Sequence, residues 1–235
     1  RAQAIAVLPY ARPHLIEDDL FQLLAGAKAS FDREQVVLDG GHSSEGNELS
    51  IGFSVSGSVD RTRIRRKGGL RPGDRLVLTK PIGTAILFAA LMRGAARAPS
   101  IEAALNGMRL SNRAAADILA AHSATAVTDV TGFGLAGHLV EMLKASAVTA
   151  SLDLNALPLY PGVEQLAREG FASSLLPQNL FLRGRVSGLP VDHPAWTILF
   201  DPQTSGGLIA GVPEDRAEAC VRALLGLSAG AAIVG

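Results

Sequence analysis

The chain has 235 residues, 48% of them hydrophobic and 19% charged, and its 22 Lys and Arg residues balance its 22 Asp and Glu residues. This composition excludes a disordered chain and a strongly basic nucleic-acid-binding protein, and no apolar run reaches the roughly 20 residues of a membrane span. The single Cys220 permits no internal disulfide. We therefore expect a cytoplasmic globular protein without nucleic-acid or membrane partners, in which local groups hold any anionic ligand.

The first part of the chain, residues 1–69, is expected to form a small α/β unit. Residues 2–8 are a short apolar run that predicts a strand, and residues 17–34 carry apolar side chains on one face, which predicts an amphipathic helix. Residues 36–38 are predicted to be a short strand that leads into a glycine-rich loop. Residues 51–55 alternate between apolar and small side chains, as in a strand with one buried face.

A polar, basic stretch, residues 61–73, contains the predicted domain junction near residues 68–71. Its arginines could bind an anion, but a solvated connector is the favoured interpretation. Beyond it, residues 70–235 alternate between strand and helix patterns, which predicts α/β layers. We expect strands at residues 75–79, 124–127, 148–154, 196–200 and 208–212, and helices at residues 82–92, 100–121, 135–143, 163–169 and 214–225.

The segment TDVTGFG, residues 128–134, is the main candidate for a functional site. It places Asp129 between the end of a predicted strand and the start of a helix. The unpaired N–H groups of a helix N-terminus attract phosphate, so Thr131 and Gly132 are candidate phosphate contacts. A carboxylate beside a bound phosphate can hold Mg²⁺. Asp129 could instead cap the helix, and the local pattern leaves both interpretations open.

Two further glycine-bearing blocks contain candidate ligand contacts. In GGHSSEG, residues 40–46, the backbone could wrap a phosphate or ribose, although a plain turn is the commoner explanation. In DPQTSGG, residues 201–207, Thr204 and Ser205 could donate to phosphate oxygens, and Asp201 could equally be a turn residue. Lys80 could contact phosphate, but we favour a surface lysine. Cys220 is predicted to be a small core residue.

These three blocks, in this order and with residues 137–139 (GHL) after the second, make the chain resemble the selenophosphate synthetases, or selenide, water dikinases. Three shorter segments resemble the branch in which this synthetase is fused behind a flavin-dependent pyridine-nucleotide oxidoreductase. They are residues 71–74 (RPGD), 79–81 (TKP) and 177–180 (PQNL).

The resemblance implies an α/β fold with α+β layers, similar to aminoimidazole ribonucleotide synthetase, with two domains per subunit in a homodimer. Residues 1–69 would be the C-terminal part of the ATP-binding and dimerisation domain, and residues 70–235 the second α/β domain. It also implies Mg²⁺-dependent phosphoryl transfer, in which ATP, selenide and water give selenophosphate, AMP and phosphate. In this reading Asp129 binds Mg²⁺, and Gly40, Gly41 and His42 reach the ATP bound mainly by the other subunit.

The chain also departs from the family. The family's N-terminal glycine-rich segment, with its Cys or selenocysteine, nearby Lys and further metal-binding aspartates, has no counterpart in this sequence. We therefore assign no catalytic nucleophile, interpret the chain as a fragment with a truncated N-terminal domain, and expect it to be inactive by itself. Two alternatives stay open: a non-catalytic dimerisation or nucleotide-binding module, and another ATP-using enzyme of the same fold, such as thiamine-phosphate kinase.

Overall fold

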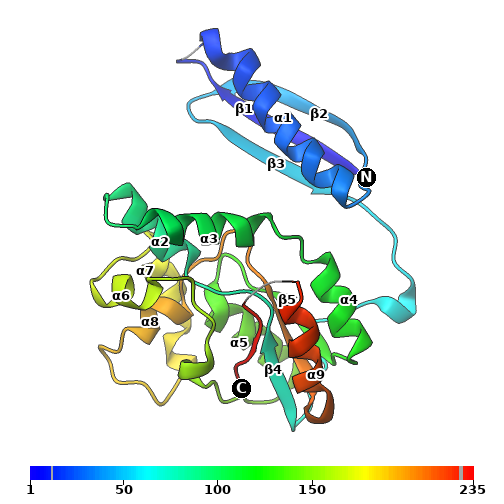
Figure 1. The fold of residues 1–235 in the computed structure, drawn as a ribbon, viewed down its shortest axis with the longest axis vertical. Coiled ribbons are helices and arrows are strands. Elements are labelled where there is room, and N and C mark those ends of the chain that lie inside the picture. The colour runs from blue at the N-terminus through cyan, green and yellow to red at the C-terminus, as the bar shows by residue number, and fades with distance from the viewer. Residues whose placement is uncertain (12, 228–229) are drawn as a thin grey trace. The chain divides into compact units, whose positions relative to one another are not determined.

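The computed structural model of the chain describes residues 1–11, 13–227 and 230–235. The chain folds into two compact units, Arg1–Ile64 and Arg65–Gly235 (Figure 1). The boundary between them lies in the polar, basic stretch of residues 61–73. Within the described residues, no helix combines the length and the apolar character needed to cross a membrane.

The first unit is a three-stranded sheet covered on one face by a helix (Figure 1). The order is β2-β1-β3; β2 is parallel to β1, and β3 is antiparallel to it. Alternate residues of β1, from Ala2 to Leu8, are buried. On this face the ring of Phe31 from α1 meets that of Phe53 edge-on, with 5.2 Å between centroids. The elements are β1 (Ala2–Pro9), α1 (Ile16–Arg33), β2 (Leu38–Gly46) and β3 (Ser50–Val55), with 3-10 turns at Pro13–Leu15 and Arg61–Arg63.

The first glycine block is part of strand β2, so the prediction of a strand at residues 36–38 followed by a loop is wrong. Gly41 pairs with Ala4 of β1, and a Cβ atom on Gly41 would collide with the carbonyl oxygen of Ala4. Glycine is therefore required at this position by the chain's own sheet. Gly40 and His42 point to the opposite, open face, and a Cβ atom on Gly40 would meet no described atom within 4 Å.

The second unit is built on a four-stranded sheet of order β5-β6-β4-β7, in which all neighbouring pairs are antiparallel. Its strands are β4 (Asp74–Leu78), β5 (Ala126–Asp129), β6 (Leu208–Pro213) and β7 (Ala232–Ile233). Its α-helices are α2 (Thr84–Met92), α3 (Ala98–Arg109), α4 (Arg113–Ala121), α5 (Gly134–Ser146), α6 (Val163–Arg168), α7 (Leu176–Asn179), α8 (Ala195–Leu199) and α9 (Glu214–Leu225). Two 3-10 helices, Leu154–Ala156 and Leu180–Arg185, complete it.

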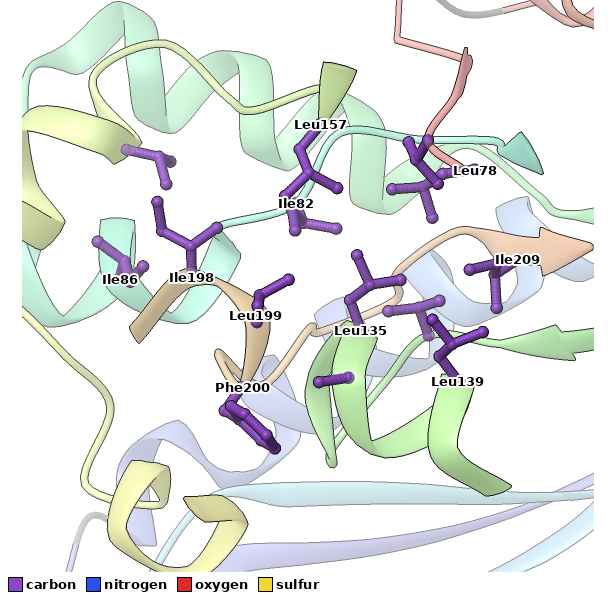
Figure 2. Close-up of a cluster of buried hydrophobic side chains, with 14 of the residues drawn as sticks. Leu78, Ile82, Ile86, Leu135, Leu139, Leu157, Ile198, Leu199, Phe200 and Ile209 are labelled. Carbon is purple, nitrogen blue, oxygen red and sulfur yellow. The ribbon is translucent and has the colours of Figure 1, made fainter. Parts of the chain in front are cut away.

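Both faces of this sheet are buried. Leu78 and Ile209 point to one face, where α2, α5 and α8 contribute to a large apolar cluster; Figure 2 shows Leu135 and Leu139 of α5 beside Ile209. The next residues along the strands, Val77 and Ala210, point the other way and pack with α4 and α9. Cys220 of α9 belongs to this second cluster, and burial raises the pKa of its thiol to about 11. Its prediction as a core residue is confirmed.

Three of the helices and strands predicted in the second unit are wrong. Residues 196–200 belong largely to helix α8, which begins after Pro194, because a short apolar run fits a buried helix as well as a strand. Residues 148–154 form no strand. Only one backbone hydrogen bond joins Asp153 to Val234: Asp153 N donates to Val234 O at 2.8 Å. Residues 100–121 form two helices rather than one, because the backbone becomes extended at Leu110, after the end of α3, and turns helical again before α4 begins at Arg113.

Candidate functional site

Asp129 is the last residue of β5, and its side chain is exposed. Its Oδ2 atom accepts a hydrogen bond from Thr131 Oγ1 at 2.8 Å, and its Oδ1 atom accepts one from Thr128 Oγ1 at 3.3 Å. The N-cap residue of α5 is Phe133, and no described side chain caps this helix. The capping interpretation of Asp129 is therefore wrong, and its carboxylate is left facing solvent.

The surroundings of the Asp129 carboxyl group favour its charged form. Partial burial pushes its pKa upward, but the hydrogen bonds that its carboxylate accepts, chiefly from Thr131 and also from Thr128, contribute to a net pKa below its usual value. Asp129 is therefore ionised at neutral pH, as a cation ligand must be.

His138 lies one loop and one helical turn away, on the buried side of α5. Its Nε2 atom is 3.2 Å from Thr131 Oγ1. The Thr131 hydroxyl uses its one hydrogen towards Asp129, so Nε2 carries a hydrogen and donates to Thr131. Burial is the main cause that lowers the pKa of His138, which favours the neutral ring. Its Nδ1 atom is buried and has no hydrogen-bond partner among the described residues. The sequence showed this histidine beside the signature segment, but we assigned it no role.

Residues 129–133 are here called the Asp129 loop, and residues 201–207 the Asp201 block. Backbone hydrogen bonds hold the loop against the block. Val130 N donates to Gly207 O and Gln203 N donates to Thr131 O, both at 2.9 Å. Gly134 has a φ of +70°, and a Cβ atom there would lie 2.7 Å from the backbone of Phe200. The structure therefore brings the second and third glycine blocks into backbone contact.

The buried start of the Asp201 block caps helix α2. Asp201 Oδ2 accepts from Ala85 N at 3.1 Å, and Gln203 Oε1 accepts from Gly83 N at 2.9 Å and Thr84 N at 3.2 Å. These are N–H groups at the beginning of the helix, which need partners from outside it. Asp201 is thus neither a simple turn residue nor a ligand group. Its role is to join the block to α2.

The exposed end of the Asp201 block contains the two predicted phosphate contacts. Ser205 Oγ donates to Met108 O at 2.8 Å, so its hydrogen is already used, whereas the side chain of Thr204 is exposed. Lys80 is 2% exposed, and its Nζ atom donates to Leu110 O at 2.6 Å and Ser205 O at 3.3 Å. Burial lowers the pKa of Lys80 to about 8. The surface interpretation of Lys80 is therefore wrong, because this side chain ties α3 to the block.

The remaining predicted site residues, Gly40, Gly41 and His42, lie in the first unit, in strand β2. A cavity of about 800 Å³ in the second unit lies along α5 and is lined by neither Asp129 nor Thr204. Asp129 and Thr204 are both exposed, so these candidate ligand groups lie on an open surface.

One group of this surface has the chemistry of a magnesium ligand. Across the described residues, no group of three or more His, Cys, Asp and Glu side chains is placed to hold a metal ion. However, Mg²⁺ is commonly bound through one or two carboxylates, with water and phosphate oxygens completing its coordination. The exposed, ionised carboxylate of Asp129 is suited to be one such ligand.

The buried carboxyl group of Asp201 yields a pH prediction. Burial raises its pKa to about 7, and its Oδ1 atom has no described partner. Between about pH 4 and pH 7 the folded protein therefore binds a proton that the unfolded chain releases, so stability should fall as the pH rises through this window. We expect urea unfolding to show a loss on the order of 2 kcal/mol from pH 5 to pH 7.5. Asp201→Asn should lack this component, and equal pH slopes for both proteins would contradict it.

The fold and the sequence identify the family. Residues 71–235 match the family described as AIR synthase related protein, C-terminal domain. The chain belongs to this family. Two solved structures resemble this AIR synthase related chain over its whole length. E. coli HypE, a hydrogenase maturation protein, has a TM-score of 0.71 and 16% sequence identity. The thiamine-monophosphate kinase of Stenotrophomonas maltophilia has a TM-score of 0.70 and 21% sequence identity. The chain covers 65% and 67% of these proteins. They confirm the predicted fold.

Curated relatives of this AIR synthase related chain carry the name selenide, water dikinase. The Myxococcus xanthus protein is 37% identical over 92% of the chain, and the Geobacter metallireducens protein is 39% identical over 81%. The chain spans 62% and 56% of their respective lengths.

Proposed function

We propose that this chain is part of a selenophosphate synthetase, which converts ATP, selenide and water into selenophosphate, AMP and phosphate. The observation that carries the proposal is the state of Asp129: an exposed, ionised carboxylate at the end of β5 that caps no helix. The segment around it, residues 128–134, resembles the signature of the selenophosphate synthetases. The selenide, water dikinase relatives at 37% and 39% identity support this choice over the thiamine-phosphate kinase alternative.

In the proposed reaction the chain binds and orients phosphate groups. Asp129 would hold Mg²⁺, which neutralises phosphate charge when bound. Thr131 orients the Asp129 carboxylate through its hydroxyl, and His138 orients Thr131 in turn. Gly132 has open space around its Cα atom, so a phosphate oxygen can approach the backbone closely. Thr204 would supply a hydroxyl from the neighbouring block, while Ser205 holds that block in place.

ATP is proposed to contact the first unit across a homodimer. The sheet itself explains why position 41 is a glycine, since a Cβ atom there would collide with the backbone of Ala4. Gly40 is not, because the described residues leave open space beside it. Close approach of a nucleotide or a partner subunit would account for glycine at this position, and His42 faces the same side. We further propose a cytoplasmic location and, on residues 71–74, 79–81 and 177–180, a fused or associated flavin-dependent oxidoreductase.

The test uses the full-length gene product that contains this chain. With ATP, Mg²⁺ and selenide it should form AMP and selenophosphate, detected by chromatography and phosphorus NMR. Omission of selenide should abolish selenophosphate formation. Formation of ADP with thiamine phosphate as acceptor, and none of AMP with selenide, would overturn the proposal in favour of a kinase of the same fold. Nucleotide binding without turnover of either acceptor would indicate a non-catalytic module.

A further inference from the structure

Asn179 connects the two glycine blocks of the second unit from a third segment. It is the last residue of the short helix α7 and is 6% exposed. Its Nδ2 atom donates to Gly132 O at 2.8 Å and to Phe200 O at 3.0 Å. Two carbonyl acceptors require the amide nitrogen on this side, because only the NH₂ group can donate. Both hydrogens of the amide are therefore used to bridge the Asp129 loop and the start of the Asp201 block.

This bridge holds the outer part of the Asp129 loop. The base of the loop is fixed by backbone bonds at Val130 and Thr131. The tip has few contacts of its own: Gly132 has no side chain, and Phe133 is 51% exposed, although its ring lies 5.6 Å from that of His138. The bond from Asn179 to the Gly132 carbonyl thus anchors the part of the loop that would face a phosphate. Gly132 also lies next to Thr131, whose hydroxyl orients Asp129.

We infer that Asn179 is a positioning residue that sets the Asp129 loop against the Asp201 block. It touches neither metal nor phosphate and acts through the carbonyl of Gly132. The inference rests on the proposed function where ligand binding is concerned. Its structural part, that this one amide holds the loop tip, stands on the two hydrogen bonds alone.

The test compares Asn179→Asp and Asn179→Ala with a matched control, Ser146→Ala. Aspartate keeps the shape of the side chain but sets an acceptor against two carbonyl oxygens, and alanine removes the donors. Ser146 lies at the other end of α5, where its hydroxyl donates to Met142 O and accepts from the backbone N–H groups of Gly69 and Leu70. The control therefore loses a comparable set of hydrogen bonds without touching the loop.

Two measurements on the full-length protein separate positioning from general stability. In hydrogen–deuterium exchange without ligand, amides of residues 130–134 should exchange about tenfold faster in both Asn179 variants, and at the wild-type rate in Ser146→Ala. In ATP binding, the Mg²⁺ concentration for half-maximal binding should rise about tenfold in the Asn179 variants only. Asn179→Asp should recover part of its loop protection at low pH, where a protonated carboxyl group again offers one donor.

The possible outcomes test the positioning role of Asn179 separately from the proposed synthetase function. Equal loop exchange in the Asn179 and Ser146 variants, or faster exchange spread evenly over the second unit, would overturn the positioning role. Faster exchange confined to the loop, with no Mg²⁺-dependent ATP binding even in the wild type, would support the role of Asn179 and overturn the proposed function. Loosened loops with unchanged Mg²⁺ dependence would refute the link between loop position and ligand binding.

Discussion

Replacing Asp129 by Asn is expected to lower AMP formation by the full-length protein at least about a hundredfold while leaving the fold intact. One carboxylate contact to a phosphate-bound Mg²⁺ should be worth several kcal/mol of transition-state stabilisation. Each ~1.4 kcal/mol corresponds to a tenfold change in rate. Asn preserves the size of the side chain and can still accept a hydrogen bond from Thr131. The rate of AMP formation and the melting temperature are to be measured together.

The matched control is Asp153→Asn. Asp153 is also exposed, lies in the same unit and accepts a short-range hydrogen bond, from Asn155 N at 2.9 Å, but it is not part of either glycine block. We expect its activity to equal that of the wild type. Full activity in Asp129→Asn with a lowered melting point would remove the metal assignment and restore a structural role for this residue.

The second large effect concerns the first glycine block. Gly40→Val and Asp129→Asn should each be inactive in homodimers of the full-length protein. Mixed subunits should regain about a quarter of the wild-type activity. Random exchange makes about half of the dimers heterodimers. If Gly40 serves the partner's nucleotide, each heterodimer gathers both lesions in one site and leaves the other undamaged.

Gly40 is the appropriate position for this experiment, and Gly41 is its control. A side chain on Gly40 meets no described atom within 4 Å, so the subunit itself should tolerate valine. A side chain on Gly41 collides with Ala4 within its own sheet, so Gly41→Val should unfold the first unit and give no recovery on mixing. Differently tagged chains would show that subunits exchange. No recovery by Gly40→Val despite exchange would mean that Gly40 acts in its own subunit's site.

The sequence predicted the elements whose signals are local. Alternation of apolar and small residues located β3, a short apolar run located β1, and an apolar face at helical spacing located α1, because burial on one face imposes a period on the residues. The first glycine block was misplaced for the opposite reason. Glycines are poor strand formers by local preference, and only pairing with β1 explains why a strand continues through Gly40 and Gly41.

At the candidate site the sequence indicated Asp129 but left its role open. The structure excludes helix capping, which no local pattern could do. Lys80, Asn179 and Gln203 were not recognised as supports of the site, because each acts on backbone atoms far away in the sequence. Gln203, for example, contacts Gly83 over a separation of 120 residues. His138 is the exception, since its position seven residues after Thr131 could have revealed the contact.

The bridge between Gly132 and Phe200 also bears on how the site comes into being. Asn179 is 47 residues from Gly132 in the sequence, and the pairing of β5 with β6 joins segments still farther apart. Contacts of such long range form only after the intervening chain has been closed into a loop, which makes them slow and late in folding. An isolated peptide with the sequence of residues 128–134 is therefore expected to lack the loop conformation that these residues have in the folded unit. We therefore expect the candidate ligand surface to form only when the second unit is completed.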